Sequence, residues 1–430
     1  MRVTLLDALP EGSLASAVRS ALAVSDVTVV AHRLREERFA PCQGCFECWV
    51  DHPGTCKATD AANPVMEDII AADVVFWTTP IRFACWDPIA KVALDKSIGL
   101  LSPFFTSVEG ETHHRRRYRR YPRCAVLAVA PADTPEEARA AFRLLVRRNA
   151  LNLHAHEPWV GFVDPGSDAG TIRAAVEEGM AAMRRPTEET VPHVTPFAPR
   201  DAVGVPRRPD RPRRVLTIVG SAKPTGSSLS EHVAGALEAR LVARGWTAER
   251  VHVQRAVKLG REGAPSLVDA AARADLLVLA APVYVDCLPS LVLAALGHLA
   301  DAALPRSTVM LPIIQCGFPE IEHTALAVEV AWRAAREAGL GWAGHLAAGG
   351  DAVWHGPLDE GKKRPQAEAL DRVASALDAG EPVPPEAIER LGASHVPAAV
   401  YRTLGNVGWV ATAMKEGLEP WKLGRRPFDE

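Results

Sequence analysis

One short pattern occurs twice in this chain, about 200 residues apart, and it constrains the fold more than any other feature. Residues 72–80 and 274–282 both read Ala-Asp, a short apolar run, two small residues and proline; Cys85 and Cys287 extend the match. Each copy lies roughly 60 to 70 residues after an apolar strand opened by Arg-Val. The sequence therefore predicts a tandem duplication of one α/β unit.

A proline-rich stretch separates the two copies. Seven prolines lie between Pro186 and Arg214, and neither a helical nor a strand period persists among them. We therefore expect a first domain over residues 1–185, a linker over 186–213, a second domain over 214–393 and a tail over 394–430 without an assignable role. The basic end of the linker, at residues 206–214, is expected to stay solvated.

In the second half, strand-like and helix-like segments alternate. The expected helices span residues 229–244 and 322–338, with a further helix before the third strand. The expected strands span residues 214–219, 250–253, 275–281, 308–314 and 343–348. Five strands alternating with helices predict a doubly wound parallel sheet, so the expected fold class is α/β with two tandem flavodoxin-like domains. Ligands of such sheets bind at the carboxyl ends of the strands.

Composition narrows the class of protein. With 430 residues, 48% of them hydrophobic, and a formal charge of −3, the chain can bury two cores and has no general attraction to nucleic acid or membrane. No apolar run reaches the roughly 18 residues that a spanning helix needs. Met1-Arg2 leads directly into a strand without a signal-peptide pattern, which predicts a cytoplasmic protein.

The first strand of the second half leads into a loop suited to phosphate. Residues 220–230 offer glycines, hydroxyls and one lysine before a helix start, where backbone NH groups and the helix dipole favour an anion. The loop resembles that of the NADPH-dependent FMN reductase and iron-sulfur flavoprotein families, through Gly220, Ser221, Lys223, Gly226 and Ser228. The resemblance implies FMN, NAD(P)H as reductant, and a phosphate site that includes Ser221, Lys223, Thr225, Gly226, Ser227 and Ser228. The alternative is a serine-rich helix cap without a ligand.

Two further loops resemble the parts of these families that face the flavin ring. One follows the third strand and contains Pro282, Val283, Tyr284 and Val285, and the other contains Gly317 and Phe318. Taken alone, Tyr284 fits a half-buried aromatic residue at a strand end equally well. His298 is expected to be a core or surface histidine.

The corresponding loops of the first half differ. The loop of the first half, at residues 7–14, has no lysine and carries the carboxylates of Asp7 and Glu11, and residues 80–83 lack the family's tyrosine. A carboxylate about 4 Å from a phosphate charge costs roughly 4 kcal/mol at an effective dielectric constant near 20. We therefore expect FMN in the second half only.

The first half has a cysteine cluster instead. Cys42, Cys45, Cys48 and Cys56 are spaced as Cys-x2-Cys-x2-Cys-x7-Cys, which resembles the compact motif of the iron-sulfur flavoproteins and implies a four-iron four-sulfur cluster. Many flavodoxin-like oxidoreductases carry a similar stretch without a cluster, so structural or redox-active thiols remain an alternative. Zinc is a third.

The run of histidines, arginines and tyrosines at residues 113–121 has no counterpart in the second half. It fits a solvated insertion, a clamp for an anionic substrate or the NADPH 2′-phosphate, or a nucleic-acid contact, the last opposed by the net charge.

These features predict an FMN-dependent, NAD(P)H-linked oxidoreductase that acts on a small molecule or passes electrons to a redox partner. The halves are expected to form a pseudo-dimer within the chain, and a homo-oligomer is also left open. The rival functions are an FMN/iron-sulfur electron-transfer protein and a non-catalytic flavodoxin-like binding protein.

Overall fold

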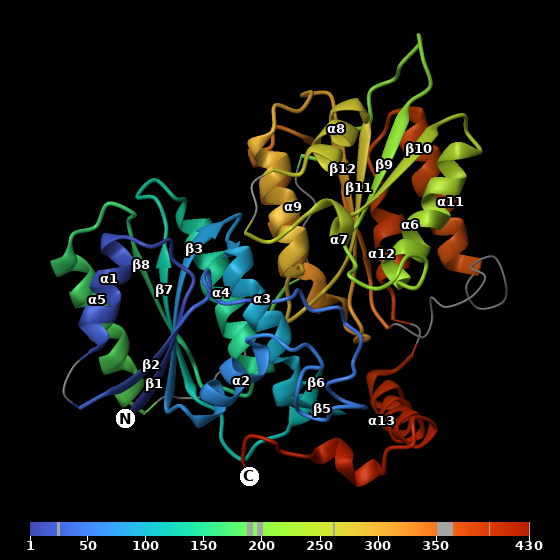
Figure 1. Cartoon of the computed structure of the whole chain (residues 1–430). Coiled ribbons are helices and arrows are strands. Elements are labelled where there is room, and N and C mark those ends of the chain that lie inside the picture. Colours follow the sequence, from blue (N-terminus) through green and yellow to red (C-terminus); the bar gives the residue numbers. More distant parts are fainter. Residues whose placement is uncertain are drawn as a thin grey trace. The chain divides into compact units, whose positions relative to one another are not determined.

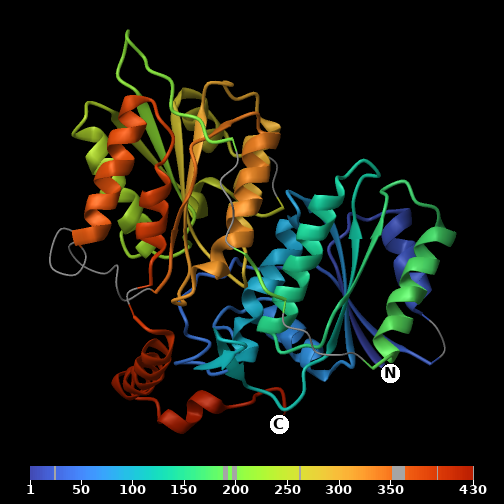
Figure 2. The same cartoon turned by 180° about the vertical axis from the view of Figure 1, so that it is seen from behind.

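The computed structural model describes residues 1–23, 26–186, 192–195, 201–260, 263–350, 364–394 and 396–429. Part of the predicted linker, at 187–191 and 196–200, lies outside these residues. The chain divides into two compact units (Figures 1 and 2). The first contains Met1–His193 and Arg402–Glu430, and the second contains Val194–Tyr401.

The first unit is an α/β domain. Its elements are β1 (Arg2–Asp7), α1 (Ser13–Leu22), β2 (Thr28–Arg33), α2 (Ala62–Ala71), β3 (Val74–Arg82), β4 (Cys85–Trp86), α3 (Pro88–Lys96), η1 (Ser97–Leu100), β5 (Leu101–Val108), β6 (Glu111–Arg116), β7 (Arg123–Val129), α4 (Glu136–Asn152), β8 (Trp159–Val163) and α5 (Ala169–Arg184). The main sheet has the order β2-β1-β3-β7-β8 with parallel neighbours, while β5 and β6 form a separate hairpin. Helices α1 and α5 pack together on one face of the sheet and bury one core there.

The second unit repeats this arrangement. Its elements are β9 (Arg214–Val219), α6 (Leu229–Val242), β10 (Thr247–His252), α7 (Val253–Ala256), α8 (Pro265–Arg273), β11 (Leu276–Pro282), α9 (Ser290–Asp301), β12 (Val309–Gln315), η2 (Ile321–Thr324), α10 (Ala325–Glu337), β13 (Gly341–Trp342), β14 (Leu346–Ala348), α11 (Arg364–Ala379) and α12 (Pro385–Gly392). The strand order is β10-β9-β11-β12-β13, with β14 also pairing with β12. Both sheets therefore have the 2-1-3-4-5 order of the flavodoxin-like fold, which confirms the predicted fold class.

The fifth strand of the second sheet differs from its prediction. Instead of one strand over residues 343–348, β13 and β14 pair with β12 in two separate pieces. Gly344 lies between them with a φ of 104°, a left-handed conformation that interrupts the strand.

The repeated aspartate has the same structural role in both units. Asp73 Oδ2 accepts a hydrogen bond of 2.8 Å from the backbone NH of Arg2, and Asp275 Oδ2 accepts one of 2.9 Å from that of Arg214. Each aspartate also donates its own NH to the carbonyl of the same arginine. The pattern that repeats in the sequence thus fastens the third strand to the first; the duplication itself stays a prediction.

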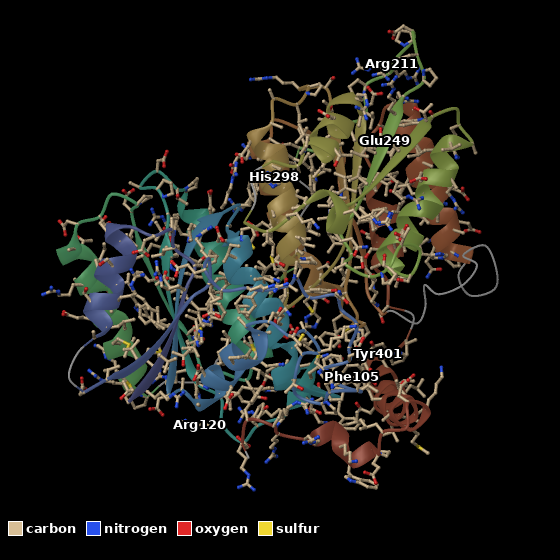
Figure 3. All side chains as sticks on the ribbon, viewed as in Figure 1. Phe105, Arg120, Arg211, Glu249, His298 and Tyr401 are labelled. Atoms are coloured by element: carbon tan, nitrogen blue, oxygen red, sulfur yellow. The ribbon has the colours of Figure 1, made fainter. Side chains whose placement is uncertain are left out.

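Residues 206–214, the basic end of the linker, are exposed or half-buried, as the sequence predicts, but the chain just before them is buried and two of their arginines bind a buried aspartate. Val205 is fully buried, and Gly204 lies so close to the end of α11 that a Cβ there would be 1.7 Å from the carbonyl oxygen of Gly380. Arg211, labelled in Figure 3, and Arg208 both bind the buried Asp275 carboxylate, at 2.8 and 2.9 Å. The basic charges are held at the amino end of the sheet because this carboxylate pairs with them.

The segment after residue 394 contains α13 (Ala398–Lys415) and η5 (Pro420–Gly424). Its part from Arg402 onwards packs on the first unit rather than forming a separate tail. The Asn406 side chain accepts a hydrogen bond of 2.7 Å from the NH of Phe105 and donates one of 3.3 Å to its carbonyl. No helix in the described part of the chain is long and apolar enough to cross a membrane.

Candidate functional site

The predicted phosphate loop joins β9 to α6 in the second unit. At its start, a Cβ on Gly220 would lie 2.6 Å from Val292 Cγ2 and 3.0 Å from Ala281 Cβ, so only glycine fits beside β11. At its end, Ser228 caps α6 by accepting a hydrogen bond from the NH of Glu231. The predicted ligands Thr225, Gly226 and Ser227 are exposed between these two fixed points, whereas Ser221 and Ser228 are buried and Lys223 is half-buried.

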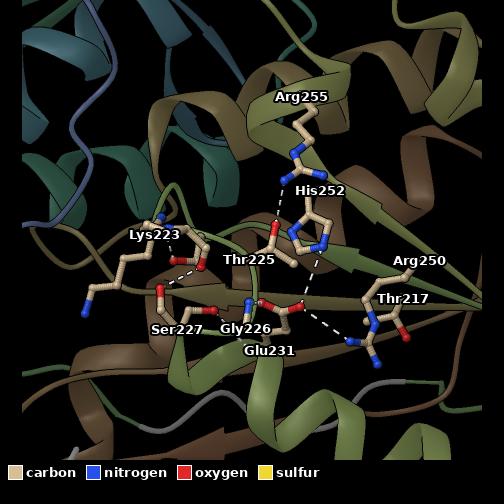
Figure 4. Close-up of polar contacts among 12 residues, drawn as sticks. Thr217, Lys223, Thr225, Gly226, Ser227, Glu231, Arg250, His252 and Arg255 are labelled. Atoms are coloured by element: carbon tan, nitrogen blue, oxygen red, sulfur yellow. Dashed lines mark hydrogen bonds and ion pairs between the residues drawn. The ribbon is translucent and has the colours of Figure 1, made fainter.

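A carboxylate that the sequence analysis missed lies inside this loop. The Glu231 side chain is buried, and its Oε2 accepts a hydrogen bond of 2.6 Å from the NH of Gly226 (Figure 4). Its Oε1 lies 3.4 Å from Arg250 Nη1 and 3.6 Å from His252 Nε2. The Ser-x-x-Glu spacing of Ser228 and Glu231 is the signal of a capping box and could have indicated that this side chain turns back to the helix start. A capping box uses the NH of the serine, however, whereas this contact uses that of Gly226.

The corresponding loop of the first unit is also satisfied by its own carboxylates. Asp7 is buried, and its Oδ1 accepts hydrogen bonds from the NH of Leu9 at 3.0 Å and from Thr78 Oγ1 at 2.6 Å. Arg19 binds both Asp7 and Glu11. In each loop a carboxylate accepts a hydrogen bond from one backbone NH, that of Leu9 in the first unit and that of Gly226 in the second. The expected restriction of FMN to the second half stays a prediction.

The loop after β11 is a tight hairpin. Tyr284 and Cys287 form an antiparallel bridge, and the two residues between them, Val285 and Asp286, have φ values of 51° and 56°. Two successive residues with positive φ define a type I′ turn, and a β-branched residue such as Val285 is rare there. Such strain persists only where the surroundings impose it, and it is concentrated at functional sites.

The first unit has the same hairpin. Arg82 pairs with Cys85, while Phe83 and Ala84 have φ values of 57° and 58°. Arg82 therefore takes the place that Tyr284 occupies in the second unit. The structural equivalence supports the alignment of the halves on their proline and cysteine residues.

The third predicted loop follows β12 and lies beside the hairpin. Asp286 of the hairpin binds His323 Nδ1 at 2.9 Å, and the His323 ring packs edge-on against Phe318 at 4.9 Å. Asp286 and His323 are both buried. A further contact, from Ser230 Oγ to Gln315 Oε1 at 3.4 Å, joins the start of α6 to the end of β12. All three predicted loops therefore meet at the carboxyl edge of one sheet, although no sequence signal marked Asp286 and His323.

The cysteine loop connects β2 to α2 in the first unit. Cys42, Cys48 and Cys56 are half-buried and Cys45 is exposed, with all four thiols reduced. Burial raises the pKa of the Cys42 thiol to about 12. Burial also raises the pKa of Cys48, and the neighbouring Cys42, Cys56 and Cys45 raise it further, so the four thiols share one electrostatic environment.

Cys56 is held by hydrogen bonds to Asn63. Its NH donates to Asn63 Oδ1 at 2.7 Å, and Asn63 Nδ2 donates to its carbonyl at 2.9 Å. The ammonium group of Lys96 lies 3.5 Å from Cys56 Sγ and 3.0 Å from Asp60 Oδ2.

The separation of the four sulfur atoms bears on which group they could hold. Within the described residues, no three of these sulfur atoms lie within 4.8 Å of one another. A single zinc ion, with Zn–S bonds of about 2.3 Å, would hold its sulfurs within about 4 Å. The four thiols are thus not arranged as an assembled zinc site, and the cluster that their spacing implies stays a prediction.

The basic run at residues 113–121 is partly buried, so the solvated-insertion interpretation is wrong for much of it. His113, Arg117, Tyr118 and Tyr121 are buried, because β6 pairs with β5 and the chain then turns inwards. Only the outer arginines face solvent, among them Arg120, which pairs with Asp73 at 2.6 Å (Figure 3). His298, labelled in Figure 3, lies half-buried in α9.

Comparison with known proteins gives structural matches alone. No protein-family model matches the chain, and no curated protein matches it. A putative quinone reductase from Klebsiella pneumoniae is 17% identical, covers 43% of this chain and 85% of its own, and has a TM-score of 0.32. An NAD(P)H:quinone oxidoreductase from Methanothermobacter marburgensis is 16% identical, covers 39% and 96%, and has a TM-score of 0.30. The apo form of an NADH:FMN oxidoreductase is 21% identical, covers 43% and 96%, and has a TM-score of 0.32. Identities and TM-scores this low do not support an inference about function, and the fold is assigned from the strand order.

Proposed function

We propose that this chain is an FMN-dependent oxidoreductase, linked to NAD(P)H, that binds FMN at the carboxyl edge of the second sheet. One observation carries the proposal. The loop at residues 220–228 leads from the central strand β9 to a capped helix start, at the point where the strand order reverses between β9 and β11. This switch point is where doubly wound sheets bind their ligands.

Several groups of the loop would bind the phosphate together. The hydroxyls of Ser221 and Ser228, the NH groups at the start of α6 and the charge of Lys223 would bind it. Tyr284 and Phe318 lie on the two neighbouring loops and would contact the ring. The Asp286–His323 pair fastens these two loops together and so fixes their separation.

FMN, when bound, supplies the hydride and electron transfer, and the protein orients it and restricts access to it. The electron acceptor is a small molecule or a redox partner. The hairpin of the first unit has Arg82 in place of the tyrosine, and its loop after β1 has no lysine, but this unit carries the four thiols. This division supports the proposal that the two halves act as a pseudo-dimer in a cytoplasmic enzyme.

A second candidate function is electron transfer through FMN and an iron-sulfur cluster. The observation that favours it is the shared environment of the four thiols. In this case the protein would oxidise NAD(P)H slowly without a partner.

The test is flavin stoichiometry in the purified full-length chain and its variants. We expect one FMN per chain, lost in the double variant Lys223→Ala/Ser228→Ala. Ser13→Ala, at the start of α1 in the first unit, is the matched control and should keep its flavin. Two flavins per chain would overturn the asymmetry, and a chain that binds no FMN at micromolar concentration would overturn the proposed function.

A further inference from the structure

The strongest unexplained feature of the first unit is a buried charge. Arg117 is 2% exposed, and among the described residues its guanidinium donates only to backbone carbonyls. Leu101 O accepts from Nε and Nη2 at 3.2 and 3.0 Å, while Leu423 O and Arg425 O accept from Nη1 at 2.9 and 2.7 Å. No carboxylate in the described part of the chain pairs with it. A buried cation is normally retained only when an anion balances it, because the charge loses its hydration.

Arg117 lies beside the cysteine loop. The NH of Gly54 donates to the Cys48 carbonyl at 2.9 Å, and a Cβ on Gly54 would lie 3.5 Å from Arg117 Cδ. The Trp49 indole, next to Cys48, donates to the same Leu101 carbonyl as Arg117. The positive charge of Arg117 also acts on the Cys48 thiol, lowering its pKa against the larger effect of burial.

The other buried charges near the thiols are paired. Lys91 binds Asp95 within α3, and Lys96 binds Asp60 at 3.0 Å. Near the thiols there are thus three buried cations, Lys91, Lys96 and Arg117, and two buried carboxylates, Asp60 and Asp95. The surplus positive charge is that of Arg117.

The C-terminal segment, residues 402–429, closes this site. Trp409 packs edge-on against Trp49 at 5.1 Å and Phe46 at 5.8 Å, both within the cysteine loop. Pro427 lies against Gly54: a Cβ there would be 2.5 Å from Pro427 Cδ. The segment therefore covers the loop, and through the carbonyls of Leu423 and Arg425 it also holds Arg117 in place.

We propose that Arg117 is a positioning residue whose charge balances an anionic, thiolate-bound group at Cys42, Cys45, Cys48 and Cys56, under the cover of the C-terminal segment. Thiols that bind metal do so deprotonated, so a cluster with four such ligands adds negative charge where the protein has a buried surplus of positive charge. The proposal does not depend on FMN binding by the second unit.

Alternatively, Arg117 has a purely structural role, in which its hydrogen bonds link three backbone carbonyls as a structural tie. The variants Arg117→Met and Arg117→Lys separate the two roles, since methionine removes the charge and lysine keeps it but loses the planar fork. Arg119→Met, an exposed neighbour in the same run, is the control. Each full-length protein is reconstituted anaerobically with iron and sulfide, and iron, sulfide, FMN and the midpoint potential are measured, with near-UV circular dichroism to confirm folding.

We expect about four irons and four sulfides per chain in the wild type, Arg119→Met and Arg117→Lys. Arg117→Met should lose cluster affinity by about 10- to 100-fold, with a more negative potential for whatever cluster remains. Equal losses in the methionine and lysine variants would overturn the proposal in favour of the structural tie. It would also be overturned by wild-type protein that takes up no iron, or that binds zinc tightly and no cluster. The FMN content of the same samples reports separately on the proposed function.

Discussion

Replacing Glu231 with glutamine should tighten FMN binding, and this is the most direct test of the phosphate-loop geometry. Glu231 Oε2 lies 2.6 Å from the Gly226 nitrogen, one of the donors that a phosphate would use. A phosphate oxygen bound to that NH at about 2.9 Å would lie within roughly 5 Å of the carboxylate unless the side chain moved. Glutamine keeps the size and the acceptor oxygen but removes the charge.

The expected gain follows from the charges around the loop. Two unit charges 5 Å apart repel by roughly 3 kcal/mol at an effective dielectric constant of 20. Arg250 at 3.4 Å offsets part of this repulsion, but it also pairs with Glu238 at 2.8 Å. A net gain of about 1 to 3 kcal/mol corresponds to a roughly 5- to 100-fold lower Kd.

The assay is a titration of FMN fluorescence quenching at low and high salt. Glu238→Gln is the control, because Glu238 shares Arg250 with Glu231 but makes no contact with Gly226. The glutamine variant at 231 should melt at a lower temperature without FMN, since a charged hydrogen bond worth about 1.5 to 3 kcal/mol is weakened. Its advantage in FMN binding should shrink in high salt. Unchanged or weaker FMN binding would show that Glu231 shapes the loop for phosphate rather than opposing it.

Three other perturbations have defined outcomes. Gly220→Ala should destabilise the second unit by about 1 to 3 kcal/mol, measured by urea unfolding, and release flavin, because its Cβ would meet Val292 and Ala281; a fully stable variant would contradict the close approach. Burial lowers the pKa of His345 from 6.5 to about 4, so the unfolded chain takes up the proton first as the pH falls. The free energy of unfolding should therefore decrease between about pH 6.5 and pH 4, by up to roughly 3 kcal/mol. His345→Leu should flatten this pH dependence in unfolding experiments, and an unchanged slope would refute the role of His345. A fragment of residues 201–401 should fold and bind FMN but turn over poorly, whereas one beginning at Pro209 should be less stable because it lacks the buried Val205; full activity of the longer fragment would exclude the first unit from the active site.

The fold could be predicted because its signals are local and repeated. Apolar runs alternating with amphipathic helices indicate a parallel sheet, and the second Ala-Asp pattern marks the same fastening of the third strand to the first. The interrupted fifth strand was missed because only the φ of Gly344 reveals it. The phosphate loop and hairpins were located by their positions after strands, which the doubly wound topology brings to one edge.

What could not be predicted depends on contacts between distant residues. Glu231 was within reach of sequence reasoning, since its capping spacing is local. By contrast, Arg117 lies in a run that looks hydrophilic, and its burial depends on carbonyls some 300 positions later. Asp286 and His323 meet only because the loops after β11 and β12 are neighbours in the sheet. Periodicity carries no information about such pairs.

The interrupted course of the first unit has a consequence for its biosynthesis. Residues 402–429 belong to a unit whose remaining parts end at His193, so the whole second unit is translated before the first can be completed. Because domains generally fold in the order in which they emerge from the ribosome, the cysteine loop should remain uncovered until residues 402–429 have been synthesised. During that interval a thiolate-bound group could reach the cysteine loop, and Trp409 and Pro427 would then cover the loop. A tag fused after residue 430 would directly follow this covering segment, so an N-terminal tag is the safer design for measuring what the loop binds.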